Sequence, residues 1–286
     1  MHPILFEWGP FSLHTYGLAM ALAFGIGIWV TSRRAAPRGF NTKFVIDLSV
    51  LILIFSLLGA RFLYVVTHWD EFADHPLDVI SPIQSNGQIG IAGLVLLGGV
   101  IAAFATVYVY SRRKQFAFFA VTDLFIPATA LGVAVGRLGC FFNGCCFGLP
   151  TNLPWGIVFP SGSLAGSVYP GVCVHPTQIY ETLWMLIVFA GLLLWDRRAR
   201  GVGQITGLFL VIYGIGRFFI ESLRWYESQM VIFQSGDARL TISQVLSAAM
   251  IFCGLALIMR SLKQPATKSQ SNRNSTPLNP PVNGGK

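Results

Sequence analysis

The sequence has few charged residues, and this shortage argues against most classes of soluble protein. Asp, Glu, Lys and Arg together make up 11% of the 286 residues, whereas a soluble globular domain carries about 25%. Hydrophobic residues make up 53% of the chain. The composition therefore predicts a membrane protein, with the lipid bilayer as one of its partners.

Acidic residues are especially scarce, with 12 Asp and Glu against 20 Lys and Arg, and a net charge of +8. Such a balance could indicate nucleic-acid binding, but no stretch combines clustered basic residues with interleaved aromatic ones. An excess of Lys and Arg in cytoplasmic loops explains the charge more simply. We therefore expect no nucleic acid as a partner.

The start of the chain also lacks basic residues. No Lys or Arg precedes Arg33, and Glu7 lies ahead of the first apolar run. A cleavable signal peptide needs a positively charged N-terminal region. The first apolar run is therefore predicted to be a membrane span and not a cleaved signal.

Seven apolar segments are long enough to cross a bilayer as helices, which needs roughly 20 residues each. Their pattern predicts an all-α polytopic membrane protein. Lys and Arg gather after the first, third, fifth and seventh segments, and the alternate loops are nearly free of them. The positive-inside rule therefore places the N-terminus outside and the C-terminus inside a bacterial cytoplasmic membrane. The predicted spans cover residues 12–32, 45–67, 90–110, 121–142, 178–195, 204–222 and 242–261.

The last residues differ in composition from the rest. Residues 264–286 are rich in Pro, Ser, Asn and Gly and have few large apolar side chains. Such a segment cannot bury enough apolar surface to fold. We predict a membrane-embedded domain over residues 1–263 and a disordered cytoplasmic tail over 264–286.

Arg61, Arg137 and Arg217 lie inside apolar runs. A charged residue at the centre of a membrane helix costs about 2.5–3.5 kcal/mol on insertion scales, so it usually has a function. The guanidinium group also matches the geometry of phosphate. At 1.5 Å per helical residue, all three arginines fall in the outer half of the membrane. The sequence therefore predicts a buried site for an anionic head group that opens toward the outer face.

Other polar residues are predicted to lie in the same layer or near it. Arg217, Glu221 and Arg224 are spaced i, i+4 and i+7, so they share one helix face. An ion pair within that helix could explain Glu221, but it would leave Arg61 and Arg137 unexplained. Asp47 and Asp123 fall near the inner ends of their spans, where we expect structural roles.

Four of the five cysteines, Cys140, Cys145, Cys146 and Cys173, are predicted near the outer face, and Cys253 lies in the last span. Their spacing matches no standard zinc template. A disulfide is an alternative in an oxidising compartment. We favour ordinary packing residues, and we expect neither a bound metal nor a cofactor.

Several motifs occur together and in order: LHTYGLAMALAF, LGARFLYVV, GRLGCFFNGCCFGLP, HPTQIYE and YGIGRFFIESLR. With them, the chain resembles the bacterial phosphatidylglycerol–prolipoprotein diacylglyceryl transferases from about residue 8 to residue 260. The resemblance implies an integral membrane enzyme. Its substrates would be phosphatidylglycerol and prolipoprotein signal peptides with a lipobox cysteine. The cysteine thiol would receive the diacylglyceryl group as a thioether, and glycerol 1-phosphate would leave.

The resemblance also implies roles for particular residues. Arg137 and Arg217 match functional arginines of the family and are expected to hold the phosphate. Tyr16, Asn143 and Gly144 match motif positions that would add hydrogen bonds or shape the lipid cavity. His14 is a further catalytic candidate from its predicted position near the outer face. The remaining residues that we expect to bind or orient substrate are Arg61, His175, Gln178, Tyr180, Glu181, Glu221 and Arg224.

The chain departs from the family pattern at Leu97, where a Tyr or His usually precedes the Gly-Gly pair. Leucine cannot accept a proton, so the residue that takes the thiol proton is left open, with His14 and His175 as candidates. Two other functions also stay open. One is an anionic-lipid transporter or flippase, which would need polar residues in both halves of the membrane. The other is a related enzyme that uses the same lipid donor with a different acceptor.

Overall fold

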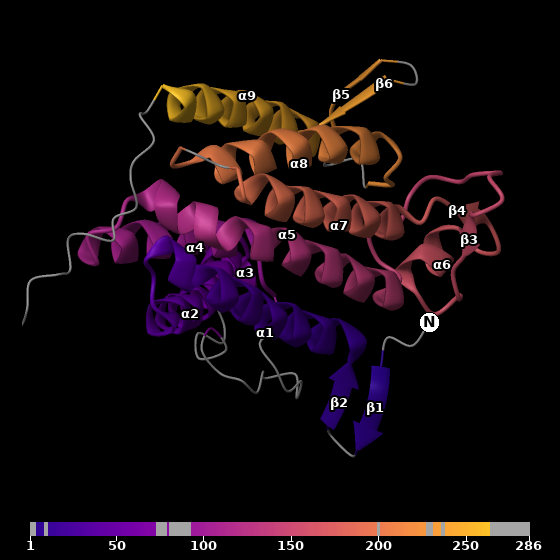
Figure 1. Ribbon diagram of the computed structural model, residues 1–286. Helices are drawn as coiled ribbons and strands as arrows, with labels where there is room; N and C mark the ends of the chain where they lie inside the picture. Colours follow the sequence, from indigo (N-terminus) through magenta and orange to yellow (C-terminus); the bar gives the residue numbers. More distant parts are fainter. Residues whose placement is uncertain are drawn as a thin grey trace, which may run out of the picture.

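The computed structural model describes residues 4–8, 11–72, 79, 93–198, 201–226, 231–235 and 238–263. Long helices run side by side through most of its length (Figure 1). Each predicted span coincides with one of them. These helices are α1 (Thr15–Ala35), α2 (Thr42–Thr67), α4 (Leu96–Arg113), α5 (Phe118–Asn143), α7 (Thr177–Asp196), α8 (Gln204–Ser222) and α9 (Ile242–Leu262).

Within the described ranges, six of these helices are long and apolar enough to cross a membrane. The protein is therefore a mainly helical, multi-pass membrane protein. Helix α4 falls short of the same measure. It begins at Leu96, later than the predicted residue 90, and its 18 residues include Arg112 and Arg113.

Short elements cap the ends of the long helices, and the sequence analysis did not predict them. The described residues form three two-stranded antiparallel sheets, and two of these are hairpins that directly precede a long helix, β1–β2 before α1 and β5–β6 before α9. The predicted disordered tail, residues 264–286, lies outside the described residues. The short elements are β1 (Ile4–Trp8), β2 (Phe11–His14), α3 (Trp69–Phe72), β3 (Ile157–Val158), α6 (Leu164–Val168), β4 (Cys173–Val174), β5 (Val231–Ser235), β6 (Ala238–Thr241) and a 3₁₀ turn (Ala36–Arg38).

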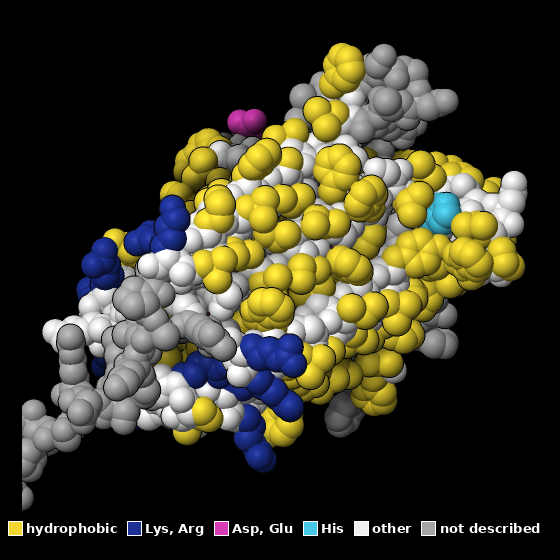
Figure 2. Space-filling model, turned by 45° about the horizontal axis from the view of Figure 1, so that its top comes forward, with side chains coloured by type: hydrophobic (Ala, Val, Ile, Leu, Met, Phe, Trp, Pro, Cys, Tyr) yellow, Lys and Arg dark blue, Asp and Glu magenta, His cyan; other side chains and the backbone are white. Residues whose placement is uncertain are grey.

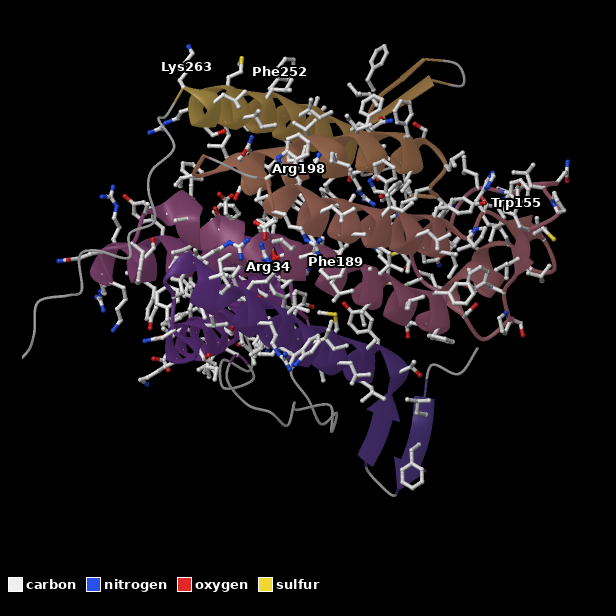
Figure 3. All side chains as sticks on the ribbon, viewed as in Figure 1. Arg34, Trp155, Phe189, Arg198, Phe252 and Lys263 are labelled. Carbon is white, nitrogen blue, oxygen red and sulfur yellow. The ribbon has the colours of Figure 1, made fainter. Side chains whose placement is uncertain are left out.

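Hydrophobic and charged side chains occupy separate parts of the surface, as expected for a protein in a bilayer. Hydrophobic side chains cover a wide face over the helices, and Lys and Arg gather toward one end (Figure 2). Lys263 lies at one end of the helix bundle and Trp155 lies at the other (Figure 3). Phe252, in the last span, is 74% exposed. Such side chains suit contact with lipid tails, because the surrounding medium is itself apolar.

Small residues allow close packing between pairs of helices. A side chain at Gly207 on α8 would lie 2.9 Å from the carbonyl oxygen of Gly254 on α9. A side chain at Gly59 on α2 would lie 2.6 Å from the carbonyl oxygen of Gly98 on α4. Glycines at membrane-helix interfaces bring backbones together where van der Waals packing drives association.

Polar contacts near the basic end of the bundle hold helices α1, α5, α7 and α8 together. Asp123 on α5 accepts hydrogen bonds from the backbone nitrogens of Gly203, at 2.6 Å, and Thr206, at 2.8 Å. It thereby satisfies amides at the start of α8 that have no partner within the helix. Arg34, near the end of α1, and Arg38, in the 3₁₀ turn that follows it, both pair with Asp196 at the end of α7. The structural role predicted for Asp123 is confirmed.

Candidate functional site

A buried ion network joins α5, α7 and α8. The Oε2 atom of Glu181 lies 3.0 Å from Nε of Arg137 and 3.1 Å from Nη1 of Arg217. Nη2 of Arg217 lies 2.9 Å from Oε2 of Glu221. The side chains of Glu181 and Glu221 are 3% and 0% exposed. The structure therefore brings two predicted arginines together through a carboxylate from a third helix.

Residues beyond the end of α8 complete this network. The hydroxyl of Tyr226 donates to Glu221 at 2.8 Å and accepts from Arg217 at 3.1 Å. The guanidinium of Arg224 lies 4.8 Å from the ring centre of Tyr226. Thr241 donates from its hydroxyl to the other oxygen of Glu221 at 3.0 Å. Sequence reasoning missed Tyr226 and Thr241, because both lie outside the helical repeat that revealed Glu221.

The network carries an unbalanced positive charge. Within the part of the chain that the structure describes, Glu181 and Glu221 are the carboxylates that pair with Arg137 and Arg217. Arg224 stacks on Tyr226 as a third cation. Among the described residues, no acceptor contacts the terminal nitrogens of Arg137, because its ion pair to Glu181 uses Nε. The two-pronged end of the Arg137 side chain therefore has hydrogen-bond donors to offer to an anion.

Arg137 lines a cavity of about 540 Å³ between α1, α2, α4 and α5. Most of its lining residues are apolar, and Arg137 is the only charged residue among the lining residues described. Along α1 the lining extends from Tyr16 to Thr31, roughly 22 Å at 1.5 Å per residue. An apolar cavity with one cationic group suits a lipid whose tails fill the cavity and whose anionic head group meets Arg137.

The loop after α5 is held against the start of α7. The Thr177 hydroxyl donates to the carbonyl of Cys146 at 2.8 Å, and the Gln178 amide donates to the carbonyl of Cys145 at 2.6 Å. Gly144 ends α5 with a φ of 72°, and a side chain there would lie 2.5 Å from Cβ of Ser163. Gln178 and Gly144 therefore fix the loop, while Asn143 is exposed at the end of α5.

His175 and Tyr180 belong to a second group of contacts. The Tyr180 hydroxyl lies 3.2 Å from Nδ1 of His175 and accepts a hydrogen bond from Trp155 at 2.8 Å. Burial lowers the pKa of His175, so the imidazole is held in its neutral form. The backbone of His14 ends β2, but its side chain lies outside the described ones, so its predicted role stays a prediction.

Arg61 has a different set of contacts from the other two arginines. Its Nε donates to the carbonyl of Val79 at 3.1 Å. Its guanidinium lies 5.0 Å from the ring centre of Phe72 and 5.8 Å from that of Tyr64. These contacts tie α2 to the segment that follows it, whereas Arg137 and Arg217 meet between α5 and α8.

Leu97 occupies the position where the family pattern has a Tyr or His. Its side chain is 59% exposed, and its neighbour Leu96 lines the cavity instead. Its neighbours Val100 and Ile101 on the same helix are also exposed and apolar, so leucine suits a surface that contacts lipid. The departure from the pattern therefore removes no group from the described lining of the cavity.

Comparison with known proteins agrees with these observations. The family model for prolipoprotein diacylglyceryl transferase matches residues 3–260. The chain is 33% identical to the phosphatidylglycerol–prolipoprotein diacylglyceryl transferase of Parasynechococcus marenigrum, over 95% of this chain and 98% of that protein. It is 37% identical to the protein of the same name from Nostoc sp., over 89% of this chain and 87% of that protein. The chain therefore belongs to the prolipoprotein diacylglyceryl transferase family.

Proposed function

We propose that this protein transfers the diacylglyceryl group of phosphatidylglycerol to the lipobox cysteine of a prolipoprotein. The observation that carries the proposal is the position of Arg137. It lines an apolar cavity, and its terminal nitrogens have no acceptor among the described residues. Family membership supplies the reaction, and the cavity supplies a place for a lipid with an anionic head group.

The charges of the site suit this reaction. The acceptor thiolate attacks the glycerol carbon that carries the phosphate, the carbon–oxygen bond breaks, and its electron pair stays on the phosphate oxygen. A phosphodiester with one negative charge thus becomes a monoester with two. Donors that are already aimed at developing charge are usually the largest catalytic contribution. Arg137 would contact the phosphate, and Arg217 would add positive charge behind it.

The glutamates hold these arginines in place. Glu181 fixes both Arg137 and Arg217, and Glu221 fixes Arg217 from the other side. Each arginine therefore enters the reaction with its orientation already set. This order matters because a misplacement of 1 Å can lower a rate by about a hundredfold.

The proposed location is the bacterial cytoplasmic membrane, with the site toward the outer face. The loops at the end where α5 meets α7 contain no Lys or Arg from residue 143 to residue 177, which indicates the outer side. A prolipoprotein cysteine reaches this side once its signal peptide has been inserted.

The test uses the full-length protein purified in detergent, phosphatidylglycerol and a lipobox peptide. We expect release of glycerol 1-phosphate and a matching gain in peptide mass, both abolished when serine replaces the peptide cysteine. Arg137→Ala should lower turnover at least about a hundredfold. Arg113→Ala removes an exposed arginine at the end of α4 and should leave turnover unchanged.

Arg137→Lys provides a second variant that keeps the charge beside Glu181. A lysine cannot pair with Glu181 and also present a two-pronged donor to phosphate, so this variant should also be strongly impaired. Full activity in both variants would refute the phosphate-binding role. Movement of phosphatidylglycerol between the leaflets of proteoliposomes, without peptide modification, would instead favour the transporter.

A further inference from the structure

Three cysteine side chains converge at the cavity. The sulfur atoms of Cys140, Cys145 and Cys146 all lie within 4.8 Å of one another, and each residue is partly buried. Cys140 belongs to the last turn of α5, and the other two follow on the loop. The spacing in the sequence favoured packing residues, but three sulfurs gathered at one point change that interpretation.

The surroundings hold the sulfurs in this arrangement. Thr177 and Gln178 bind the carbonyls of the loop cysteines. Cys146 has a φ of 62°, a left-handed conformation that residues other than glycine seldom adopt. Cys140 and Cys146 both line the cavity, together with Arg137. The cluster therefore has one side on a preformed loop and another side open to the lipid site.

We propose that Cys140, Cys145 and Cys146 bind one zinc ion, whose fourth coordination position faces the cavity and takes the acceptor thiol. Tetrahedral zinc with Zn–S bonds of about 2.3 Å separates its sulfurs by about 3.8 Å. The three sulfurs already lie within 4.8 Å of one another, close to the spacing that tetrahedral coordination requires. Catalytic zinc sites characteristically have three protein ligands and one open position.

This inference rests on the proposed transferase reaction. It supplies the removal of the proton from the acceptor thiol, a step that the described side chains of the cavity do not supply. A free cysteine thiol with a pKa of about 8.5 is only about 3% ionised at pH 7. Coordination to zinc removes the thiol proton, which passes to water. The sulfur then attacks the glycerol carbon and leaves the metal as a thioether, while the bonding electrons move to the phosphate oxygen. Complete ionisation of the acceptor thiol would raise the rate about 30-fold at pH 7.

The charges near the cluster are compatible with a zinc–thiolate centre. Three thiolates and one zinc ion carry one net negative charge, and the acceptor thiolate adds a second. Arg137 lines the same cavity as Cys140 and Cys146, so its positive charge lies on the side where the cluster is open. This arginine of the phosphate site would thus also offset the charge of the metal site, and the two substrates would meet between the two sites.

The first experiment measures zinc in the full-length protein, purified in detergent under reducing conditions. We expect one zinc ion per chain by mass spectrometry of the metal. Cys140→Ser and Cys146→Ser should lower the affinity for zinc at least tenfold, measured by competition with a chromophoric chelator. Cys173→Ser and Cys253→Ser change exposed cysteines outside the cluster and should bind zinc normally. A wild-type protein that binds no zinc, or whose active form has a disulfide within the cluster, would overturn the proposal.

The second experiment tests the open position in the unmutated protein. Cobalt replaces zinc, and its visible absorption should change when a lipobox peptide is added but not when serine replaces the peptide cysteine. Turnover of the zinc protein should vary little between about pH 7 and 8.5. In Cys146→Ser it should fall about tenfold per pH unit below about 8.5, because the acceptor titrates as a free thiol.

The outcomes separate this inference from the proposed reaction. Bound zinc with no spectral response to the peptide would refute acceptor binding by the metal. A spectral response without glycerol 1-phosphate release under any condition would refute the transferase and leave the zinc–thiol site standing. Turnover in a zinc-free wild-type protein at the full rate would refute the catalytic role.

Discussion

Glu181 offers a sharp test of the ion network, because one of its oxygens holds two arginines. Oε2 accepts from Arg137 and Arg217, while Oε1 is buried and has no hydrogen-bond partner among the described residues. In Glu181→Gln, the amide oxygen can replace Oε2 and the amide nitrogen can replace Oε1. The substitution therefore removes the negative charge with almost no change in shape.

The expected magnitude follows from the burial of this charge. Removing one partner of a buried ion pair costs about 3–5 kcal/mol. We take about 3 kcal/mol, because glutamine retains one acceptor for the arginines. Since each 1.36 kcal/mol corresponds to a tenfold change in rate, kcat should fall about a hundredfold if this loss reaches the transition state. KM for phosphatidylglycerol should stay constant or fall, because the site becomes more positive.

The control is Asp196→Asn at the opposite end of the bundle. Asp196 also pairs with two arginines, Arg34 and Arg38, and its side chain is largely buried. This variant should lower Tm in detergent, as Glu181→Gln does, but should leave kcat unchanged. The assay is glycerol 1-phosphate release at varied lipid concentration. Equal loss of kcat in both variants, or a Glu181→Gln enzyme within threefold of wild type, would refute the positioning role.

Three further outcomes are expected. Tyr226→Phe removes one hydroxyl that bridges Arg217 and Glu221, so kcat should fall roughly 2- to 13-fold for a hydrogen bond worth about 0.5–1.5 kcal/mol. Asp123→Ala leaves buried amides at the start of α8 without an acceptor, so Tm should fall while kcat of the folded fraction is unchanged. Burial lowers the pKa of His175, so below about pH 6.5 the unfolded state binds more protons and stability falls. Tm measured between pH 8 and pH 5.5 should drop less in His175→Gln than in wild type.

The membrane helices could be predicted because their signal is local. Twenty apolar residues in a row indicate a span whatever the neighbouring helices are, and all seven predicted segments coincide with long helices. The start of α4 is an exception. Residues 90–95 read GIAGLV and are apolar enough to extend the predicted span, yet α4 itself begins at Leu96.

The site could be predicted only in part, because its contacts join distant segments. Spacing on one helix revealed the pair of Arg217 and Glu221, which the structure shows at 2.9 Å. No spacing rule connects Arg137 to Glu181, which lie 44 positions apart and meet only because α5 packs against α7. The same signal, a charge in an apolar run, also singled out Arg61, although its described partners include backbone carbonyls and aromatic rings. The free-energy cost of burying a charged side chain shows that the charge needs a partner, but it does not identify that partner.

The polar contacts at the two ends of the bundle argue for chemistry over transport. A transporter would have to expose its anion site alternately to both sides. At the basic end, Arg34 donates to the backbone carbonyl of Leu124 and pairs with Asp196, so α1, α5 and α7 are joined there. Asp123 joins α5 to α8 at the same end. These contacts would all have to break for Arg137 to face the cytoplasm. A transferase needs no such opening, because its lipid enters from the bilayer, and in the proposed orientation its peptide and its soluble product both lie on the outer side.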